Sequence, residues 1–181
     1  VLDEGTPVGT GFTFAGLDFV GDGVTVTSTG IGTTATITIS GFGPDAQQNL
    51  YAGTDAGAAS DADTLRNIAI GCKSGCSLNE GDDNVFLGTS SGACVTSGSC
   101  NVFLGFDAGK FTTCGSSNIA IGPSAGYNSP GGDNNVFLGI GAGRQVSTGE
   151  NNIFLGQNSG GQNASAPTTG IDNISLGRSS G

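Results

Sequence analysis

The chain is dominated by small and turn-forming residues: 35 of its 181 residues are glycine and 5 are proline. That is about three times the glycine share of an average globular protein, which disfavours a close-packed helical domain. The formal charge of −10 disfavours binding to nucleic acid or to an anionic membrane surface. Histidine is absent, so the commonest general base is missing. No run approaches the roughly 18 apolar residues of a membrane span, so we predict no membrane insertion.

Residues 1–45 are predicted to form a small antiparallel β module. Four short runs of β-branched or aromatic residues are separated by glycine-rich turns: Phe12–Phe14, Leu17–Val20, Val24–Thr27 and Thr34–Ile39. Such runs are typical of strands. A module of this length buries little core alone, so we expect it to need partner chains. Ala56–Asp63, which follows the module, is expected to be a loop or a short helix.

Residues 46–181 contain a repeated nine-residue pattern. It consists of Asn, an aliphatic residue, a variable residue, a second aliphatic residue, Gly, two free positions, a small residue and Gly. The asparagines that mark the copies are Asn49, Asn67, Asn84, Asn101, Asn118, Asn135, Asn152 and Asn173, with steps of 18, 17, 17, 17, 17, 17 and 21 residues. A fixed period of this kind is the signature of a solenoid.

A period of 17 residues favours a parallel β-helix or β-roll, in which each copy forms one rung of two short strands and two turns. Counting from the Asn as position one, we expect the aliphatic residues at positions two and four to point inward and stack as an apolar column. The glycines at positions five and nine fit sharp turns with positive φ, around a small residue in a narrow interior. The asparagines are expected to form a hydrogen-bonded ladder along the axis.

Position three carries the largest side chains. In chain order the residues are Tyr51, Ala69, Phe86, Phe103, Ala120, Phe137, Phe154 and Ser175. If positions two and four point inward, this row lies outside and forms an apolar patch that soluble monomers rarely expose. We therefore predict that the row packs against its counterparts around a rotation axis, in a homotrimer. The alternative is that the row is the core of a wider, two-layered roll.

Two of the copies resemble a known family. Asn67–Gly71 and Asn118–Gly122, both Asn-Ile-Ala-Ile-Gly, are similar to the Ser-Val-Ala-Ile-Gly core of the left-handed parallel β-roll in trimeric autotransporter adhesin heads of the YadA type. The phenylalanine-containing copies look more like repeats of phage tail fibres. The resemblance covers residues 49–181, and it departs from the adhesin heads in the 17-residue step and in the phenylalanines.

This resemblance implies a structural, non-enzymatic segment of a trimeric surface fibre that serves host attachment. A phage tail fibre shaft in the virion is the first interpretation, and an adhesin head on a bacterial cell surface is the alternative. The implied partners are further copies of the chain, neighbouring fibre or tail proteins, and a host receptor bound through another segment. The longest insertion, Gly161–Gly170, has no aromatic residue that could anchor a receptor. We therefore expect the rungs from 67 to 160 to set the reach of the fibre more than its recognition. An open solenoid end exposes its apolar column, so we also expect further protein to cover the last rung.

Five cysteines lie close together in the sequence: Cys72, Cys76, Cys94, Cys100 and Cys114. Cys94 and Cys100 flank one turn, and Cys76 and Cys94 are nearly one rung apart, so either pair could form a disulfide. The pairing stays open. The Cys-x3-Cys spacing at Cys72 and Cys76 has no matching second pair, which disfavours a zinc site.

Acidic residues recur at the turn before the strand, at Asp82, Asp83, Asp133 and Glu150. Stacked carboxylates suggest calcium binding, and paired carboxylates suggest a polysaccharide-cleaving tailspike. Solvated turns are the favoured interpretation, because serine takes the same place in other copies and the acids follow the repeat. We therefore predict no catalytic, cofactor-binding or metal-binding residue and no cofactor.

Overall fold

The computed structural model describes residues 2–3, 6–7, 24–27, 36–39, 44–160 and 169–181. The chain divides into two compact units, Val1–Gly43 and Pro44–Gly181. In the first unit, β1 (Leu2–Asp3) pairs antiparallel with β2 (Thr6–Pro7), and β3 (Val24–Thr27) pairs antiparallel with β4 (Thr36–Ile39). The predicted strands at Phe12–Phe14 and Leu17–Val20 lie outside the described residues, so the antiparallel module as a whole stays a prediction.

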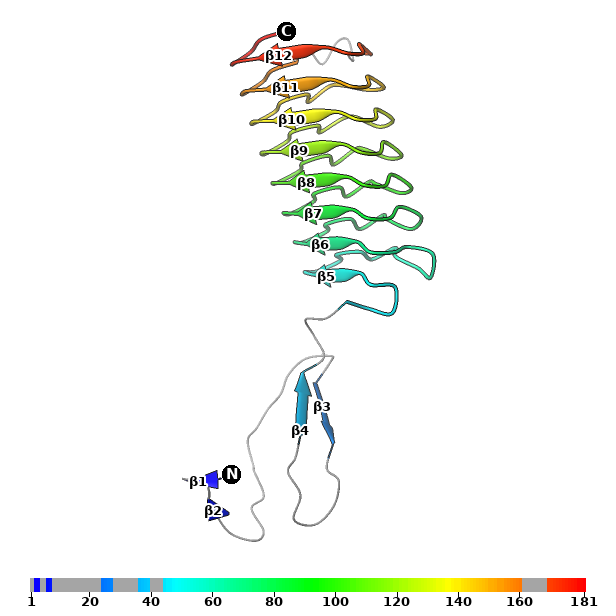
Figure 1. Cartoon of the computed structure of the whole chain (residues 1–181), viewed down its shortest axis with the longest axis vertical. Helices are drawn as coiled ribbons and strands as arrows, with labels where there is room; N and C mark the ends of the chain where they lie inside the picture. Colours follow the sequence, from blue (N-terminus) through cyan, green and yellow to red (C-terminus); the bar gives the residue numbers. More distant parts are fainter. Residues whose placement is uncertain (1, 4–5, 8–23, 28–35, 40–43, 161–168) are drawn as a thin grey trace. The chain divides into compact units, whose positions relative to one another are not determined.

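The second unit is an all-β solenoid of about seven turns, as the repeat predicts. Eight parallel strands stack in chain order along its axis (Figure 1): β5 (Leu50–Ala52), β6 (Ile68–Ile70), β7 (Val85–Leu87), β8 (Val102–Leu104), β9 (Ile119–Ile121), β10 (Val136–Leu138), β11 (Ile153–Leu155) and β12 (Ile174–Leu176). The register is one to one, so that Phe86 lies beside Phe103 on the next rung. Each described rung contributes one three-residue strand where two were expected, and the part of the chain that is described contains no helix. Ala56–Asp63 is a loop built of turns.

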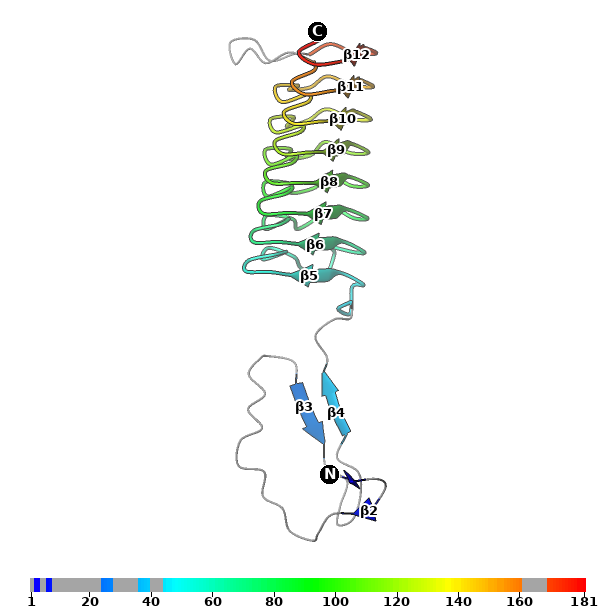
Figure 2. The ribbon, with the colours of Figure 1, turned by 90° about the vertical axis from the view of Figure 1, so that its left-hand side faces the viewer.

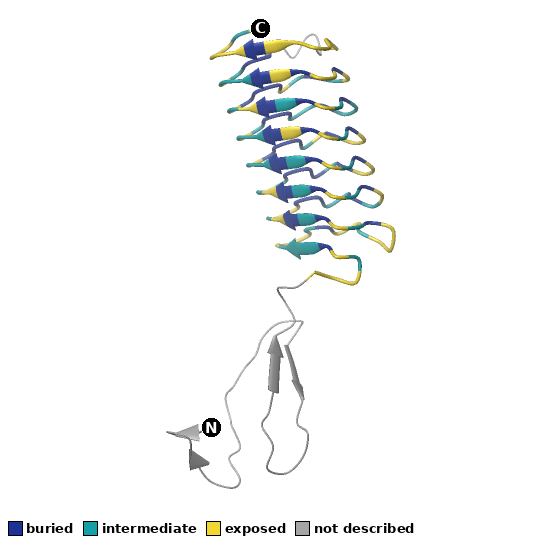
Figure 3. Ribbon diagram, viewed as in Figure 1, coloured by how far each residue is buried: buried dark blue, intermediate teal, exposed yellow. Residues whose placement is uncertain are grey.

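The residues at position three form the core, and the prediction that they point outward is wrong. Phe86 is 0% exposed, whereas its aliphatic neighbour Leu87 is 37% exposed (Figure 3). The reason is steric: the phenylalanine rings span the narrow interior and pack against the Gly at position nine, where a Cβ on Gly109 would overlap the ring of Phe103. Strand side chains alternate in direction. Because the rings at position three point inward, the side chains at positions two and four point outward. The alternative interpretation of the row as a core was right about its burial, although the core lies within each rung.

The core alternates between large and small residues along the axis. Phe86 stacks on Phe103 with ring centroids 5.3 Å apart, and Phe137 stacks on Phe154 at 5.7 Å. Buried alanines precede each pair, at positions 69 and 120. Buried aliphatic residues at position twelve of several rungs complete the cluster: Leu78, Val95 and Val146. A single column of rings, alanines and position-twelve side chains therefore fills the solenoid.

The predicted asparagine ladder is present. Asn84 donates from its backbone N–H and from Nδ2 to Oδ1 of Asn67, at 2.9 and 3.0 Å, and its Nδ2 also donates to the carbonyl of Gly98 at 2.9 Å. The same bonds to the preceding asparagine recur up to Asn173. From Asn49 to Asn152 each side-chain amide is buried and satisfies the backbone of two rungs at a position that water does not reach.

Asp45 closes the ladder at the first rung. Its Oδ1 accepts from the backbone N–H of Asn49 at 2.7 Å, and its Oδ2 accepts from Nδ2 of Asn49 at 3.2 Å. Its own N–H donates to the carbonyl of Asn49 at 2.8 Å. One aspartate therefore makes the contacts that a preceding rung would supply.

The predicted glycine geometry is confirmed. Gly71 at position five has φ +136°, and a Cβ there would lie 2.5 Å from the carbonyl oxygen of Gly88 on the next rung. Gly75 at position nine has φ +55°. The residue before each asparagine is also left-handed without being glycine, as in Asp83, Cys100 and Ser117, with φ between 58° and 60°. Sequence reasoning missed this position, although its enrichment in Asp and Asn is the expected signal.

Candidate interaction surfaces

The outward face of the strands is an apolar stripe, which we call the strand face: positions two and four of β5 to β12. Every residue on it is aliphatic, from Leu50 to Leu176. The strands lie along one side of the stack (Figure 2), so these side chains form one continuous row. Leu138 is 46% exposed and Ile174 is 70% exposed. Seven steps of about 4.8 Å give the strand face a length of roughly 34 Å.

The segment that returns from the far end of each strand forms the opposite wall of the rung. Phe103 spans the interior to Gly109 on this segment, so the residues that follow Gly109 lie across the core from the strand. Thr112 at position twelve is buried, while Phe111 at position eleven is 40% exposed. We call positions ten and eleven the return face.

The return face does not repeat. Position ten is occupied in successive rungs by Cys76, Ala93, Lys110, Tyr127 and Arg144. Bulky aromatic and cationic residues therefore gather in three consecutive rungs. The backbone fixes their spacing, because the N–H of Phe111 donates to the carbonyl of Tyr127 at 2.9 Å and the N–H of Asn128 donates to that of Arg144 at 3.0 Å.

Tyr127 is the centre of this group. Its ring meets that of Phe111 edge to face, with centroids 5.0 Å apart. Nζ of Lys110 lies 5.9 Å from the Tyr127 centroid, and Cζ of Arg144 lies 5.2 Å from it. Lys110 also forms an ion pair with Asp107 at 3.1 Å, which raises the pKa of the lysine. Both cations are thus held against aromatic rings.

The acidic turns are hydrogen-bonding positions of the solenoid. Oδ1 of Asp133 accepts from the N–H of Ser116 at 2.7 Å, as Oγ of Ser116 accepts from the N–H of Ser99 at 3.1 Å. Serine and aspartate therefore serve as equivalent acceptors there. Asp83 forms a bidentate pair with Arg66, at 2.7 and 2.8 Å, and the guanidinium lowers the pKa of that carboxyl.

All five cysteines are free thiols in the structure. Cys76 donates to the carbonyl of Ala93 at 3.3 Å. Burial raises the pKa of Cys94, and the neighbouring Cys76 adds to the effect. A raised pKa leaves less of the reactive thiolate, so the geometry gives Cys94 no activation as a nucleophile.

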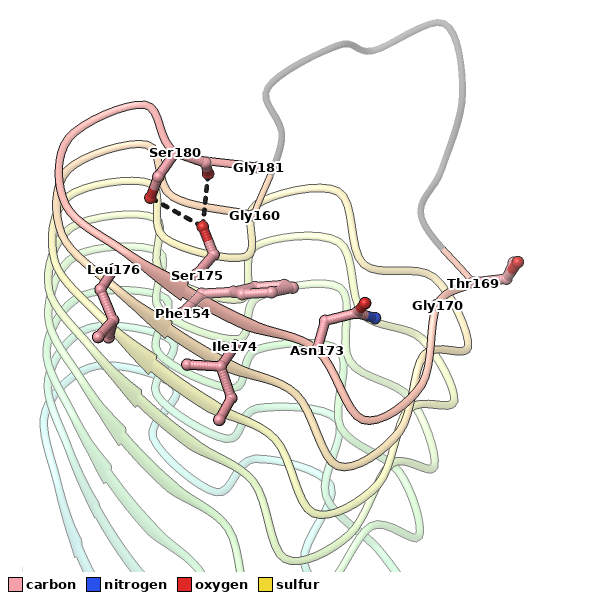
Figure 4. Close-up of a pocket in the computed structure, with 10 residues that line it drawn as sticks. All are labelled: Phe154, Gly160, Thr169, Gly170, Asn173, Ile174, Ser175, Leu176, Ser180 and Gly181. Atoms are coloured by element: carbon pink, nitrogen blue, oxygen red, sulfur yellow. Dashed lines mark hydrogen bonds between the residues drawn. The ribbon is translucent and has the colours of Figure 1, made fainter.

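The last rung of the solenoid, which contains β12, borders a hollow (Figure 4). The hollow has a volume of about 570 Å³, and Phe154, Ile174 and Leu176 are among its lining residues. Oγ of Ser175 bonds to the carbonyl oxygen of Ser180 at 2.7 Å. Asn173 donates to the ladder below it, and no bond to its own Oδ1 is found in the described part of the chain. The two described ends of the ladder therefore differ: Asp45 bonds to the first asparagine, and Ile174 and Leu176 are exposed at β12.

Within the described residues, no group of three or more His, Cys, Asp or Glu side chains is placed to hold a metal ion. No helix among them is long and apolar enough to cross a membrane. Comparisons with protein-family models, with curated proteins and with solved structures find no match.

Proposed function

We propose that this chain is a structural, non-enzymatic segment of a homotrimeric surface fibre that serves attachment, namely the shaft of a phage tail fibre. The strand face is the observation that carries the proposal. It is apolar in every rung, and its exposed members include Leu87, Leu138 and Ile174. Exposed apolar surface of this extent marks an interaction site.

A second copy of the chain fits the strand face. Rotational symmetry brings the same face of every copy to one axis. The five 17-residue steps keep the rungs of neighbouring copies level along that axis. In a ring of three, each strand face meets two neighbours, whereas in a dimer it meets one. A face only one short strand wide therefore buries most in the ring.

Sedimentation of the purified chain tests the assembly. We expect about three times the chain mass of 17.6 kDa. The double variant Leu87→Glu, Leu138→Glu should sediment as a folded monomer, because burying each leucine contributes on the order of 2 kcal/mol per chain. Ile140→Glu is the matched control: it makes the same kind of change two residues further on, at a side chain that is 54% exposed and outside the strand.

Circular dichroism checks that each variant keeps its fold. A wild-type chain that is folded and monomeric at micromolar concentration would contradict the proposed assembly. Loss of the trimer in Ile140→Glu as well would show that the strand face is not the interface. Attachment itself is tested on the intact fibre, where deletion of the 17 residues from Asn101 to Ser117 should shorten the fibre and leave the trimer folded.

A further inference from the structure

We propose that the aromatic and cationic group on the return face, formed by Lys110, Phe111, Tyr127 and Arg144, binds a saccharide that carries a carboxylate. The group places bulky aromatic and cationic side chains at positions ten and eleven of three consecutive rungs. It lies across the core from the strand face, so an assembly through the strand face leaves it open to solvent. The proposed saccharide site therefore does not depend on the proposed trimer.

Arg144 is the residue that would bind the carboxylate. In the described part of the chain, no carboxylate lies within ion-pairing distance of its guanidinium, whereas Lys110 and Arg66 each have an acidic partner. Its guanidinium is held over the ring of Tyr127 with Cζ 5.2 Å from the centroid. A guanidinium that meets a ring through a cation–π contact keeps N–H groups for paired hydrogen bonds to a carboxylate. Its side chain is therefore positioned in advance for a planar anion.

The rest of the group fits a sugar ring. Phe111, which is 40% exposed, offers an apolar aromatic surface for the C–H groups of a saccharide. Beside the ring and the arginine, Nδ2 of Asn128 donates to Oε1 of Gln145 at 3.3 Å. Carboxamides both donate and accept, which matches hydroxyl groups. From Lys110 to Arg144 the group extends over two rung spacings, or about 10 Å.

Charge and backbone pairing distinguish a saccharide from other anions. Between residues 101 and 149 two cations, Lys110 and Arg144, balance two carboxylates, Asp107 and Asp133, so the negative charge of the chain lies elsewhere. A densely charged phosphate chain binds where positive charge is in excess. A region with balanced charges therefore favours a ligand that carries isolated carboxylates. An extended peptide binds by pairing with free backbone N–H and C=O groups at a sheet edge. The N–H groups of Phe111 and Asn128 already donate to carbonyls of the next rung.

The test measures binding of the full chain to polygalacturonate, with neutral dextran and polyglutamate as comparison polymers. We expect binding to polygalacturonate, no binding to dextran, and weaker binding to polyglutamate. Arg144→Gln and Tyr127→Ala should each weaken binding at least about tenfold, the effect of losing one charge-assisted contact or its support. Lys73→Gln is the matched control, because it removes one cation from an exposed position on another part of the rung.

Three results would overturn the proposal. The first is no binding to polygalacturonate at low ionic strength, and the second is an equal loss of binding in Lys73→Gln. The third is equal affinity for polyglutamate, which would show that the group recognises charge alone. Circular dichroism and sedimentation of each variant separate a lost site from a lost fold or a lost trimer, so the two proposals fail separately.

Discussion

The strand face and the return face meet solvent in the same chain, yet their side chains vary to very different degrees. On the strand face every rung carries an aliphatic residue at positions two and four, although Leu87 and Leu138 are well exposed. On the return face, position ten changes from Ala93 to Lys110 to Tyr127 in successive rungs. Backbone pairing between rungs is equally regular on both walls.

The uniform strand face raises the question of whether strand formation alone explains its aliphatic residues. Strand propensity accounts for valine and isoleucine at position two, but leucine at position four is not β-branched. The stack of rungs covers these leucines only in part, with 37% of Leu87 and 46% of Leu138 exposed. A uniformly apolar face that the monomer leaves exposed is the pattern of an interface, whereas a face that varies is free to carry recognition.

The largest expected loss of stability comes from removing a buried phenylalanine ring at position three of a strand. Phe137→Ala should lower the free energy of unfolding by about 3 to 5 kcal/mol, because the ring is 1% exposed and its removal leaves a cavity between Ala120 and Phe154. Phe111→Ala makes the same change on the return face and should cost less than about 1 kcal/mol. Chemical denaturation measures both. An equal loss of stability in the two variants would contradict the assignment of Phe137 to the core and of Phe111 to the return face.

The asparagine ladder gives the next largest effect. Asn118→Ala removes the oxygen to which the N–H and Nδ2 of Asn135 donate, both at 3.0 Å, and the donor to the Gly132 carbonyl at 2.7 Å. We expect a loss of about 3 kcal/mol in the free energy of unfolding, because buried polar groups lose their partners. Asn128→Ala on the return face breaks one 3.3 Å bond and should cost about 0.5 kcal/mol. A ladder variant as stable as its control would show that water replaces the amide.

Much of this fold follows from the sequence, because hydrogen bonding and close approach leave few choices. The period, the parallel strands, the asparagine ladder and the left-handed glycines were predicted from Asn67–Gly75 and its copies. Each of these positions has a backbone reason for its residue. The aspartate at position 45 was not recognised as a cap, because it lies outside the repeat and acts only through contacts with Asn49.

The direction of the strand side chains could not be predicted from the alternation alone. Val85-Phe86-Leu87 is apolar on both faces, so periodicity does not say which face is buried. The choice depends on tertiary fit: the missing Cβ of Gly92 makes room for the ring of Phe86. The return-face group was also missed, because Lys110, Tyr127 and Arg144 are adjacent only once the 17-residue steps are stacked.

The smallest expected change in stability comes from the turn residue that precedes the asparagine of a rung. Ser117 has φ +60°, a conformation that costs serine more than asparagine, whose short amide tolerates it. Ser117→Asn should therefore raise the free energy of unfolding by about 0.5 kcal/mol, a rise of roughly 1 to 2 °C in Tm for a chain of this size. Ser97→Asn, at an exposed residue without a positive φ, should give no rise. Thermal denaturation of both variants measures the difference, and a gain at Ser97 alone would mean that backbone conformation does not select the residue before each asparagine.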